Sequence, residues 1–253
     1  MKQLNEKVAI VTGAGQGIGK GIALCLAKRG VKIVATGRRL EPIEQTIAEI
    51  KELGGDGFAM SCDSADRAKV EEVVKATVDT YGTVDVVVNN AQAIVPSAPV
   101  EETTYENMLK AWESGVIGSL NYMQAAFPYM KEQHEGRIIN FASATGMFGI
   151  AGQLAYGSNK EALRGLTKIA AKEWGQYGIC VNIVLPGAES PAAKAWAAKF
   201  PEEYAKQVNL NPMKRTGDPE KDIAPVIAFL AGPDSCYYSG QSVIVDGANS
   251  IMP

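Results

Sequence analysis

The hydrophobic pattern of the chain alternates between short apolar runs rich in β-branched residues and longer segments with helical periodicity. The apolar runs predict strands at Val8–Thr12, Lys32–Thr36, Gly57–Ser61, Asp85–Asn89, Arg137–Phe141, Cys180–Leu185 and Ser242–Val245. Several of these runs are almost continuously hydrophobic, which is typical of parallel strands that are buried on both faces.

Segments with helical periodicity separate the predicted strands. They predict helices near Gly17–Arg29, Leu40–Leu53, Arg67–Tyr81, Tyr105–Glu132, Leu154–Tyr177 and Pro219–Ala231. This alternation indicates an α/β protein in which helices cover a doubly wound, seven-stranded parallel sheet. No linker, repeat or low-complexity tract divides residues 1–253, so we expect a single domain.

Residues 188–212 interrupt the alternation, because they form a long insertion with flanking prolines after the sixth predicted strand. An insertion at the carboxyl end of a strand is a candidate lid over a substrate site. Within it, Trp196, Phe200 and Tyr204 recur every four residues and predict one helical face. That face either covers a flat apolar ligand or packs on the body of the protein.

Composition narrows the classes of function. The hydrophobic share of 46%, the charged share of 21% and the net charge of −3 are those of a soluble globular protein, with no basic field for nucleic acid. The first residues lack the apolar stretch of a signal peptide and no run has membrane-spanning length, so we expect a cytoplasmic protein. The four cysteines are scattered and His134 is the only histidine, so we expect reduced thiols and no metal site.

Glycines follow the first predicted strand in the run Thr12-Gly13-Ala-Gly15-Gln-Gly17-Ile-Gly19. Gly13, Gly17 and Gly19 allow a tight turn from strand to helix and a close approach of the backbone to a ligand. The free N–H groups at the start of the following helix are suited to a pyrophosphate. The loop therefore predicts a dinucleotide site, and the alternative is a glycine-rich turn without a ligand.

The end of the second predicted strand indicates which dinucleotide is bound. An acidic residue there would hydrogen-bond the ribose 2′-hydroxyl and repel a 2′-phosphate. Gly37 occupies that position and two arginines follow it, of which Arg38 can bind a 2′-phosphate through two hydrogen bonds. We therefore predict NADP(H) over NAD(H). The alternative is that Arg38 and Arg39 only begin a solvated helix.

A tyrosine and a lysine, Tyr156 and Lys160, lie four residues apart in a predicted helix and share one face of it. A nearby ammonium favours the phenolate, so Lys160 is expected to lower the pKa of Tyr156 and let it exchange a proton near neutral pH. The hydroxyl of Ser143, just upstream, can hydrogen-bond the same substrate oxygen. The alternative is that Tyr156 and Lys160 are ordinary surface residues.

Motifs from one end of the chain to the other resemble the short-chain dehydrogenase/reductase family. The matching residues are Thr12-Gly-x-x-x-Gly-Ile-Gly19, Asp63 after the third strand, Asn89-Asn90-Ala91 after the fourth, Ser143, Tyr156-x-x-x-Lys160 and Pro186-Gly187. The resemblance implies a dimeric or tetrameric Rossmann enzyme that transfers hydride between a nicotinamide cofactor and a secondary alcohol. Tyr156 would be the acid/base, and Ser143 would hold the substrate oxygen.

The resemblance also implies which residues bind the cofactor. They are Gly13, Gln16, Gly17, Ile18, Gly19, Arg38, Asp63, Asn90, Tyr156, Lys160, Pro186 and Gly187. Asp63 would contact the adenine, Asn90 would line the cofactor cleft, and Lys160 would bond the nicotinamide ribose.

The chain departs from the family pattern at two positions. Gln92 places a bulky amide where the family usually has a small residue. Gly115 stands where many members carry an asparagine thought to hold a proton-relay water, and Asn121 is too far along the helix to replace it. The relay is then absent or changed, through extra water or through Ser114.

Further motifs, among them Asn90-Ala-Gln-Ala93, Phe127-Pro-Tyr-Met130 and Glu173-Trp-Gly175, resemble bacterial NADP-dependent hydroxysteroid dehydrogenases, in particular the 12α-enzymes that act on bile acids. A hydroxysteroid or bile acid is therefore the expected substrate. The substrate residues would be Gln92, Ser143, Met147, Gln153, Tyr156 and Trp196. The alternatives are a reductase of 3-oxoacyl thioesters, sugars or xenobiotic ketones, and a non-catalytic dinucleotide-binding module.

Overall fold

All the predicted strands are present in the computed structural model, which describes residues 1–189 and 191–251. The strands are β1 (Val8–Thr12), β2 (Lys32–Gly37), β3 (Gly57–Ser61), β4 (Val86–Asn89), β5 (Gly136–Phe141), β6 (Ile179–Pro186) and β7 (Ser242–Val245). They form one seven-stranded parallel sheet in the order β3-β2-β1-β4-β5-β6-β7. The predicted doubly wound sheet is confirmed.

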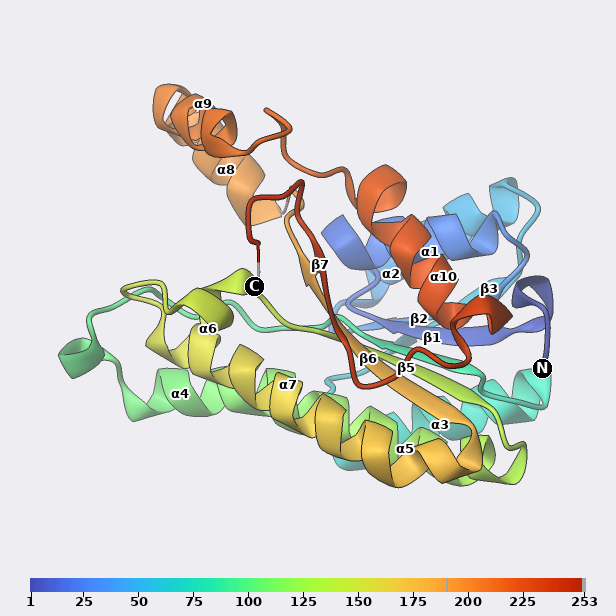
Figure 1. Ribbon diagram of the computed structural model, residues 1–253. Helices are drawn as coiled ribbons and strands as arrows, with labels where there is room; N and C mark the ends of the chain where they lie inside the picture. The colour runs from blue at the N-terminus through green and yellow to red at the C-terminus, as the bar shows by residue number, and fades with distance from the viewer. Residues whose placement is uncertain (190, 252–253) are drawn as a thin grey trace.

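Helices cover both faces of this sheet (Figure 1). One face carries α1 (Gly17–Ala27), α2 (Leu40–Glu52) and α10 (Ala224–Ala231), and the other carries α3 (Arg67–Tyr81), α4 (Tyr105–Trp112), α5 (Gly118–Glu132) and α7 (Leu154–Trp174). The short helix α6 (Ala144–Phe148), which follows β5, was not predicted from the sequence pattern.

The core explains why the strands are continuously hydrophobic. In β1, Ala9 and Val11 belong to the apolar cluster beneath α1 and α10, whereas Ile10 belongs to the cluster beneath α3 and α5. All three side chains are fully buried. Burial on both faces, as expected for a parallel sheet with helices on each side, is therefore confirmed.

The helix predicted at residues 105–132 is interrupted by a π-helical turn, η3 (Glu113–Ile117), between α4 and α5. Two glycines allow neighbouring segments to approach this turn closely. A Cβ at Gly115 would lie 2.3 Å from Asn159 Oδ1, and a Cβ at Gly118 would lie 2.8 Å from Ser64 Cβ. The prediction of one regular helix is wrong here, because packing against α7 and the loop after β3 distorts it.

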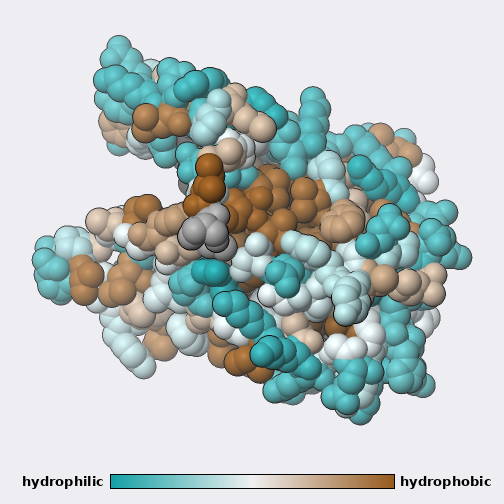
Figure 2. All heavy atoms as spheres, in the orientation of Figure 1, coloured by the Kyte–Doolittle hydropathy of each residue, from teal (hydrophilic) through white to brown (hydrophobic). Residues whose placement is uncertain are grey.

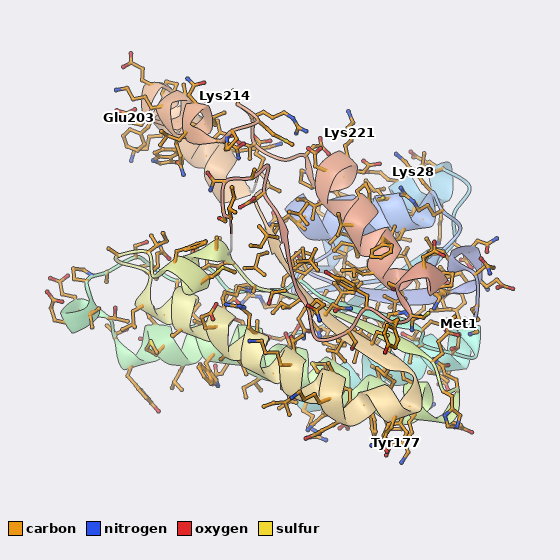
Figure 3. All side chains as sticks on the ribbon, in the orientation of Figure 1. Met1, Lys28, Tyr177, Glu203, Lys214 and Lys221 are labelled. Atoms are coloured by element: carbon orange, nitrogen blue, oxygen red, sulfur yellow. The ribbon has the colours of Figure 1, made fainter. Side chains whose placement is uncertain are left out.

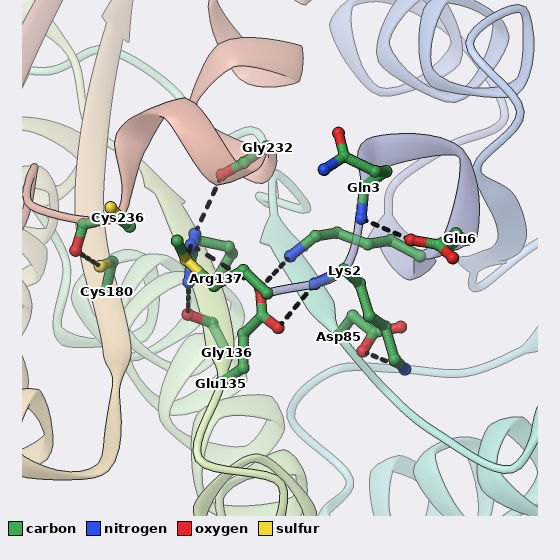
Figure 4. Close-up of polar contacts among 12 residues, drawn as sticks. Lys2, Gln3, Glu6, Asp85, Glu135, Gly136, Arg137, Cys180, Gly232 and Cys236 are labelled. Carbon is green, nitrogen blue, oxygen red and sulfur yellow. Dashed lines mark hydrogen bonds and ion pairs between the residues drawn. The ribbon is translucent and has the colours of Figure 1, made fainter.

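The amino edge of the sheet is held by polar contacts (Figure 4). The fully buried Lys7 places its Nζ 2.8 Å from Glu135 Oε1. Asp85 Oδ2 accepts a hydrogen bond from the Val8 N–H at 2.9 Å, and Asp85 Oδ1 forms an ion pair with Lys2 Nζ at 2.8 Å. Each of these charges has a partner from another segment, so this edge is a structural clamp between the N-terminal residues and β4 and β5.

Two helices, α8 (Pro191–Lys199) and α9 (Pro201–Leu210), make up most of the insertion at 188–212, whose residue 190 lies outside the described residues. They project from the carboxyl end of the sheet (Figure 1), and Glu203 and Lys214 mark their outer end (Figure 3). Trp196, Phe200 and Tyr204 do not share one helix, because Pro201 begins a second helix directly after Phe200. That part of the prediction is wrong, although the three rings remain in one cluster.

In residues 1–189 and 191–251, no helix is both long enough and apolar enough to cross a membrane. The same residues contain no group of three His, Cys, Asp or Glu side chains placed to hold a metal ion.

Candidate active site

The glycine loop between β1 and α1 adopts the tight turn that the sequence predicts. Gly13 and Gly17 have φ values of +66° and +54°, which side chains disfavour. A Cβ at Gly19 would lie 2.3 Å from the Gly13 carbonyl oxygen, so only glycine fits this position. Gln16 is extended and precedes α1, and Ile18 packs on the core. The start of α1 can therefore present free N–H groups to an anion.

A cleft of about 660 Å³ runs along the carboxyl ends of the strands from this loop. Its lining includes the loop itself, Arg38 and Arg39 after β2, Asp63 after β3, and residues 91–93 after β4. The volume lies within the range of about 300–1,000 Å³ that is usual for ligand pockets. The close-packed glycines, the exposed arginines and this length of cleft fit the phosphates and adenosine of a dinucleotide.

Asn90 was expected to line the cleft, but the structure places it against the glycine loop. Its Nδ2 donates to the Thr12 carbonyl at 2.9 Å, and its backbone N–H donates to Thr12 Oγ1 at 2.9 Å. The residues that line the cleft are its neighbours Ala91 and Gln92. Asn90 therefore holds the loop in place, because its amide satisfies backbone groups at the end of β1.

Ser143, Tyr156 and Lys160 come together at the carboxyl end of β5. Ser143 follows the strand, its Oγ accepts the Thr145 N–H at 3.2 Å, and its hydroxyl lies near enough to Tyr156 to act on the pKa of that phenol. Lys160 Nζ lies 5.5 Å from the Tyr156 ring centroid and donates to the Phe141 carbonyl at 2.8 Å. The alternative interpretation, in which Tyr156 and Lys160 are ordinary surface residues, is excluded because Lys160 is buried.

The electrostatics of this group differ from the prediction. Burial raises the pKa of Tyr156, and the polar interaction with the nearby Ser143 hydroxyl offsets only part of that increase. Burial also lowers the pKa of Lys160 to about 7. The expected lowering of the Tyr156 pKa by an ammonium is wrong, because the lysine loses much of its charge at neutral pH and donates to a backbone carbonyl.

A notch separates the lid from the part of the molecule formed by α4 and α6 (Figure 2), and the remaining predicted substrate residues belong to three different segments. Met147 packs on the small apolar cluster that includes Leu163. Gln153 donates its Nε2 to Ser97 Oγ at 2.6 Å. Trp196 contacts its lid neighbours, with 5.9 Å between its ring centroid and that of Tyr204. The structure thus gathers Ser143 with Tyr156, whereas these three residues make separate contacts of their own.

A second cavity of about 390 Å³ lies between the residues that follow the lid and the carboxyl end of β7. Pro186 ends β6, and Gly187, one of the residues that line this cavity, donates its N–H to the Val245 carbonyl at 2.8 Å. A Cβ at Gly187 would lie 2.5 Å from Asp246 Cβ, so glycine is required where β6 and β7 end side by side. Pro186 and Gly187 therefore lie at the carboxyl edge, as predicted from the motif.

Asn159 is a site residue that no sequence motif indicated, and its side chain fills the space beside Gly115. Asn159 Nδ2 donates to Gln92 Oε1 at 2.8 Å, and Gln92 Nε2 donates to Ser114 Oγ at 3.0 Å. The two departures from the family pattern, at Gln92 and Gly115, are therefore parts of one contact. The signal in the sequence that could have indicated this role is the position of Asn159, an amide between Tyr156 and Lys160 on a buried face of the helix.

Comparison with known proteins places this fold and site in a family. A family model described as enoyl-(acyl carrier protein) reductase matches residues 13–248. The chain belongs to the short-chain dehydrogenase/reductase family, whose members include alcohol and ketone oxidoreductases.

Two curated relatives and one solved structure illustrate the range of its similarities. The chain is 37% identical to a 12α-hydroxysteroid dehydrogenase of Clostridium sp., over 98% of each chain. It is 36% identical to a 3-oxoacyl-(acyl-carrier-protein) reductase of Thermotoga maritima, over 97% of this chain and 98% of the relative. It also superposes on NAD⁺-bound xylitol dehydrogenase with a TM-score of 0.90 and 32% identity, over 98% of this chain and 100% of that chain.

Proposed function

We propose that the protein catalyses reversible hydride transfer between NADP(H) and a secondary alcohol or ketone, with a hydroxysteroid or bile acid as substrate. The observation that carries this proposal is the grouping of Ser143, Tyr156 and Lys160 at the carboxyl end of the sheet. The glycine loop and the cleft beside it supply the dinucleotide site of the same reaction.

In this proposal Tyr156 moves the proton. During oxidation its hydroxyl oxygen accepts the proton of the substrate alcohol, and during reduction it returns a proton to the carbonyl oxygen. Ser143, whose hydroxyl lies near that of Tyr156, holds the same substrate oxygen. The nicotinamide, when bound, accepts or supplies the hydride at its C4. Lys160, whose pKa is lowered to about 7, can change its charge beside Tyr156 near neutral pH.

The proposed preference for NADP(H) rests on the residues around the end of β2. Gly37, Arg38 and Arg39 line the cleft there, and no carboxylate precedes the arginines in this loop. A guanidinium recognises a phosphate through charge-assisted hydrogen bonds, whereas NAD⁺ offers only a hydroxyl at the same position. Asp63 and Gln16, with the rest of the glycine loop, would hold the adenosine and pyrophosphate groups.

A hydroxysteroid is proposed because the notch below the lid has exposed apolar side chains on both sides. Trp196 and Phe200 of the lid are 36% and 39% exposed, and Phe148 at the end of α6 and Ile150 after it are 51% and 54% exposed. Hydrophobic residues are visible on both sides of the notch (Figure 2), which suits a flat apolar ligand. The similarity to the Clostridium 12α-hydroxysteroid dehydrogenase, over nearly the whole of both chains, supports the same substrate class.

We also propose that the chain functions as a single domain in the cytoplasm, as a homotetramer or homodimer. The support is its membership of the family and its nearly full-length match to the relatives. Light scattering coupled to size exclusion measures the assembly directly.

A substrate panel tests the proposed function. We expect NADP⁺-dependent oxidation of hydroxysteroids or bile acids with a higher kcat/KM than that of cyclohexanol, xylitol or a 3-hydroxyacyl thioester. Preferred turnover of the thioester or the sugar alcohol would replace the steroid proposal with the corresponding reductase or dehydrogenase. An absence of turnover with every alcohol, together with tight NADPH binding, would instead favour a non-catalytic dinucleotide-binding module.

A further inference from the structure

A fully buried amide, Asn159, lies one residue before Lys160 on α7 and joins this helix to two other segments. Its Oδ1 accepts the N–H of Val116 in η3 at 3.1 Å, and its Nδ2 donates to Gln92 Oε1 at 2.8 Å. Asparagine is a poor residue for a helix interior, and a buried amide is costly unless it is bonded. These contacts provide the hydrogen bonds that a buried amide needs.

The contacts continue from Gln92 into the π-helical turn. Gln92 Nε2 donates to Ser114 Oγ at 3.0 Å and to the Ala111 carbonyl at 3.2 Å. The Val116 N–H can only donate and the Ala111 carbonyl can only accept. The orientations of both amides are therefore fixed by backbone groups at the two ends of the chain of bonds. We name Gln92, Ser114 and Asn159 the amide bridge.

Gly115 and Asn159 share one space. A Cβ at position 115 would lie 2.3 Å from Asn159 Oδ1, 2.5 Å from its Nδ2 and 2.7 Å from its Cγ. Real side chains do not approach so closely, so any residue larger than glycine at 115 must displace the Asn159 amide. The π-helical turn and the amide of α7 are therefore interlocked.

The amide bridge reaches both halves of the candidate site. Gln92 and Ser114 line the dinucleotide cleft, and Asn159 precedes Lys160, whose Nζ donates to the Phe141 carbonyl. We propose that Asn159, acting through Gln92 and Ser114, is a positioning residue that fixes the helix carrying Tyr156 and Lys160 against the wall of the cofactor cleft. Its effect on turnover rests on the proposed function, whereas its effect on cofactor affinity does not.

A matched pair of substitutions tests this proposal. Asn182 in β6 makes the same kind of contacts away from the amide bridge: its Oδ1 accepts the Gln241 N–H at 3.1 Å and its Nδ2 donates to the Tyr238 carbonyl at 2.7 Å. Asn159→Ala and Asn182→Ala each remove a buried amide bonded on both sides, so we expect similar losses in thermal midpoint. Only Asn159→Ala should weaken NADPH binding and lower kcat, each by roughly 10- to 100-fold, because it misplaces the site.

Equal changes in NADPH Kd for the two variants would overturn the proposal, because Asn159 would then contribute only to stability. Fluorescence titration of NADPH gives this Kd without any substrate. A wild-type protein that binds NADPH but oxidises no alcohol would contradict the proposed function, and the Kd comparison would still decide the role of Asn159.

A double-mutant cycle tests the interlock separately. In the wild-type background, Gly115→Ala should weaken NADPH binding about as much as Asn159→Ala does, because the new Cβ displaces the amide. In the Asn159→Ala background, Gly115→Ala should change Kd less than about twofold, since the atoms it would meet are gone. Additive effects in the cycle would contradict the interlock.

Discussion

Two buried lysines lie at opposite ends of the sheet, and their ammonium groups have different partners. At the amino edge, Lys7 is 0% exposed and its Nζ lies 2.8 Å from Glu135 Oε1. At the carboxyl edge, Lys160 is 3% exposed and its Nζ bonds the Phe141 carbonyl. Over residues 1–189 and 191–251, no carboxylate forms an ion pair with Lys160.

The pKa values follow from this difference. Burial alone would raise the pKa of Glu135, but hydrogen bonds from Lys7 and from the Lys2 backbone, with nearby positive charges, lower it. Lys160 has no such compensation, and burial lowers its pKa to about 7. A paired buried charge is consistent with a structural role, whereas an unpaired one is typical of a functional site. The predictions below follow from this contrast, beginning with the largest effect.

The strongest effect on activity among the charged residues is expected for Lys160→Met. Kcat should fall at least about 100-fold, because proton transfer through Tyr156 depends on its surroundings. The free energy of unfolding should not fall, since the substitution removes an unpaired buried amine. Steady-state kinetics and urea unfolding of the same preparation measure both. A Lys160→Met variant that is less stable and fully active would show that Lys160 has a structural role and not a functional one.

Lys7→Met should have the opposite outcome. It removes the nearest positive charge from the partly buried Glu135 carboxylate and leaves only Arg137 Nη2 at 3.9 Å and the Lys2 N–H at 3.1 Å. Breaking a buried pair costs about 3–5 kcal/mol of stability. Kcat per folded molecule should remain within twofold, because the amino edge lies at the far end of the strands. Urea unfolding provides the measurement, and Lys7→Met combined with Glu135→Gln serves as the control that should recover part of the loss. A loss below about 1 kcal/mol would show that the pair is not a clamp.

Arg38 extends the contrast to a charge whose proposed partner is a ligand. Arg38→Ala should weaken NADP⁺ binding roughly 10- to 100-fold, because a hydrogen bond to a charged group contributes about 1.5–3 kcal/mol. Binding of NAD⁺ should change less than twofold. Titration of both cofactors measures the ratio, and a wild-type preference for NAD⁺ that survives the substitution would remove Arg38 from this role.

Taken per pH unit, the smallest effect is the pH dependence of stability. The pKa of Lys160 is about 7 in the folded protein and about 10.4 in an unfolded chain. Between these values the unfolded chain holds a proton that the folded protein has lost. Lys160 should therefore make stability rise with pH from 7 towards 10, by up to about 1.4 kcal/mol per pH unit. Urea unfolding at pH 7, 8 and 9 should show this rise relative to Lys160→Met, and parallel curves would contradict it.

The sequence predicted the features that depend on local pattern. The strands, the glycine loop and the proximity of Ser143 to Tyr156 follow from periodicity, from glycine conformations and from a family motif, and all are present. The pKa direction of Tyr156 was missed, because burial by distant segments decides it. The role of Asn159 was missed for a similar reason. Its amide contacts Gln92 and the turn at Gly115, which come from two other segments of the chain.

The lid shows an intermediate case. The spacing of Trp196, Phe200 and Tyr204 predicted that the three rings would meet, and they do. It also predicted one helical face, but Pro201 starts a new helix within the pattern. Proline is favoured at the first position of a helix. Pro201 therefore indicates a new helix start within the four-residue spacing, and the structure follows the proline.

The central claim is that Tyr156 exchanges the proton in an NADP(H)-linked hydride transfer, and Tyr156→Phe tests it most directly. The substitution removes one hydroxyl and keeps the ring beside Lys160. Measured with the best secondary alcohol of the panel, kcat should fall roughly 10²- to 10⁴-fold, while the Kd for NADPH stays within twofold. Turnover close to that of the wild type would contradict the claim.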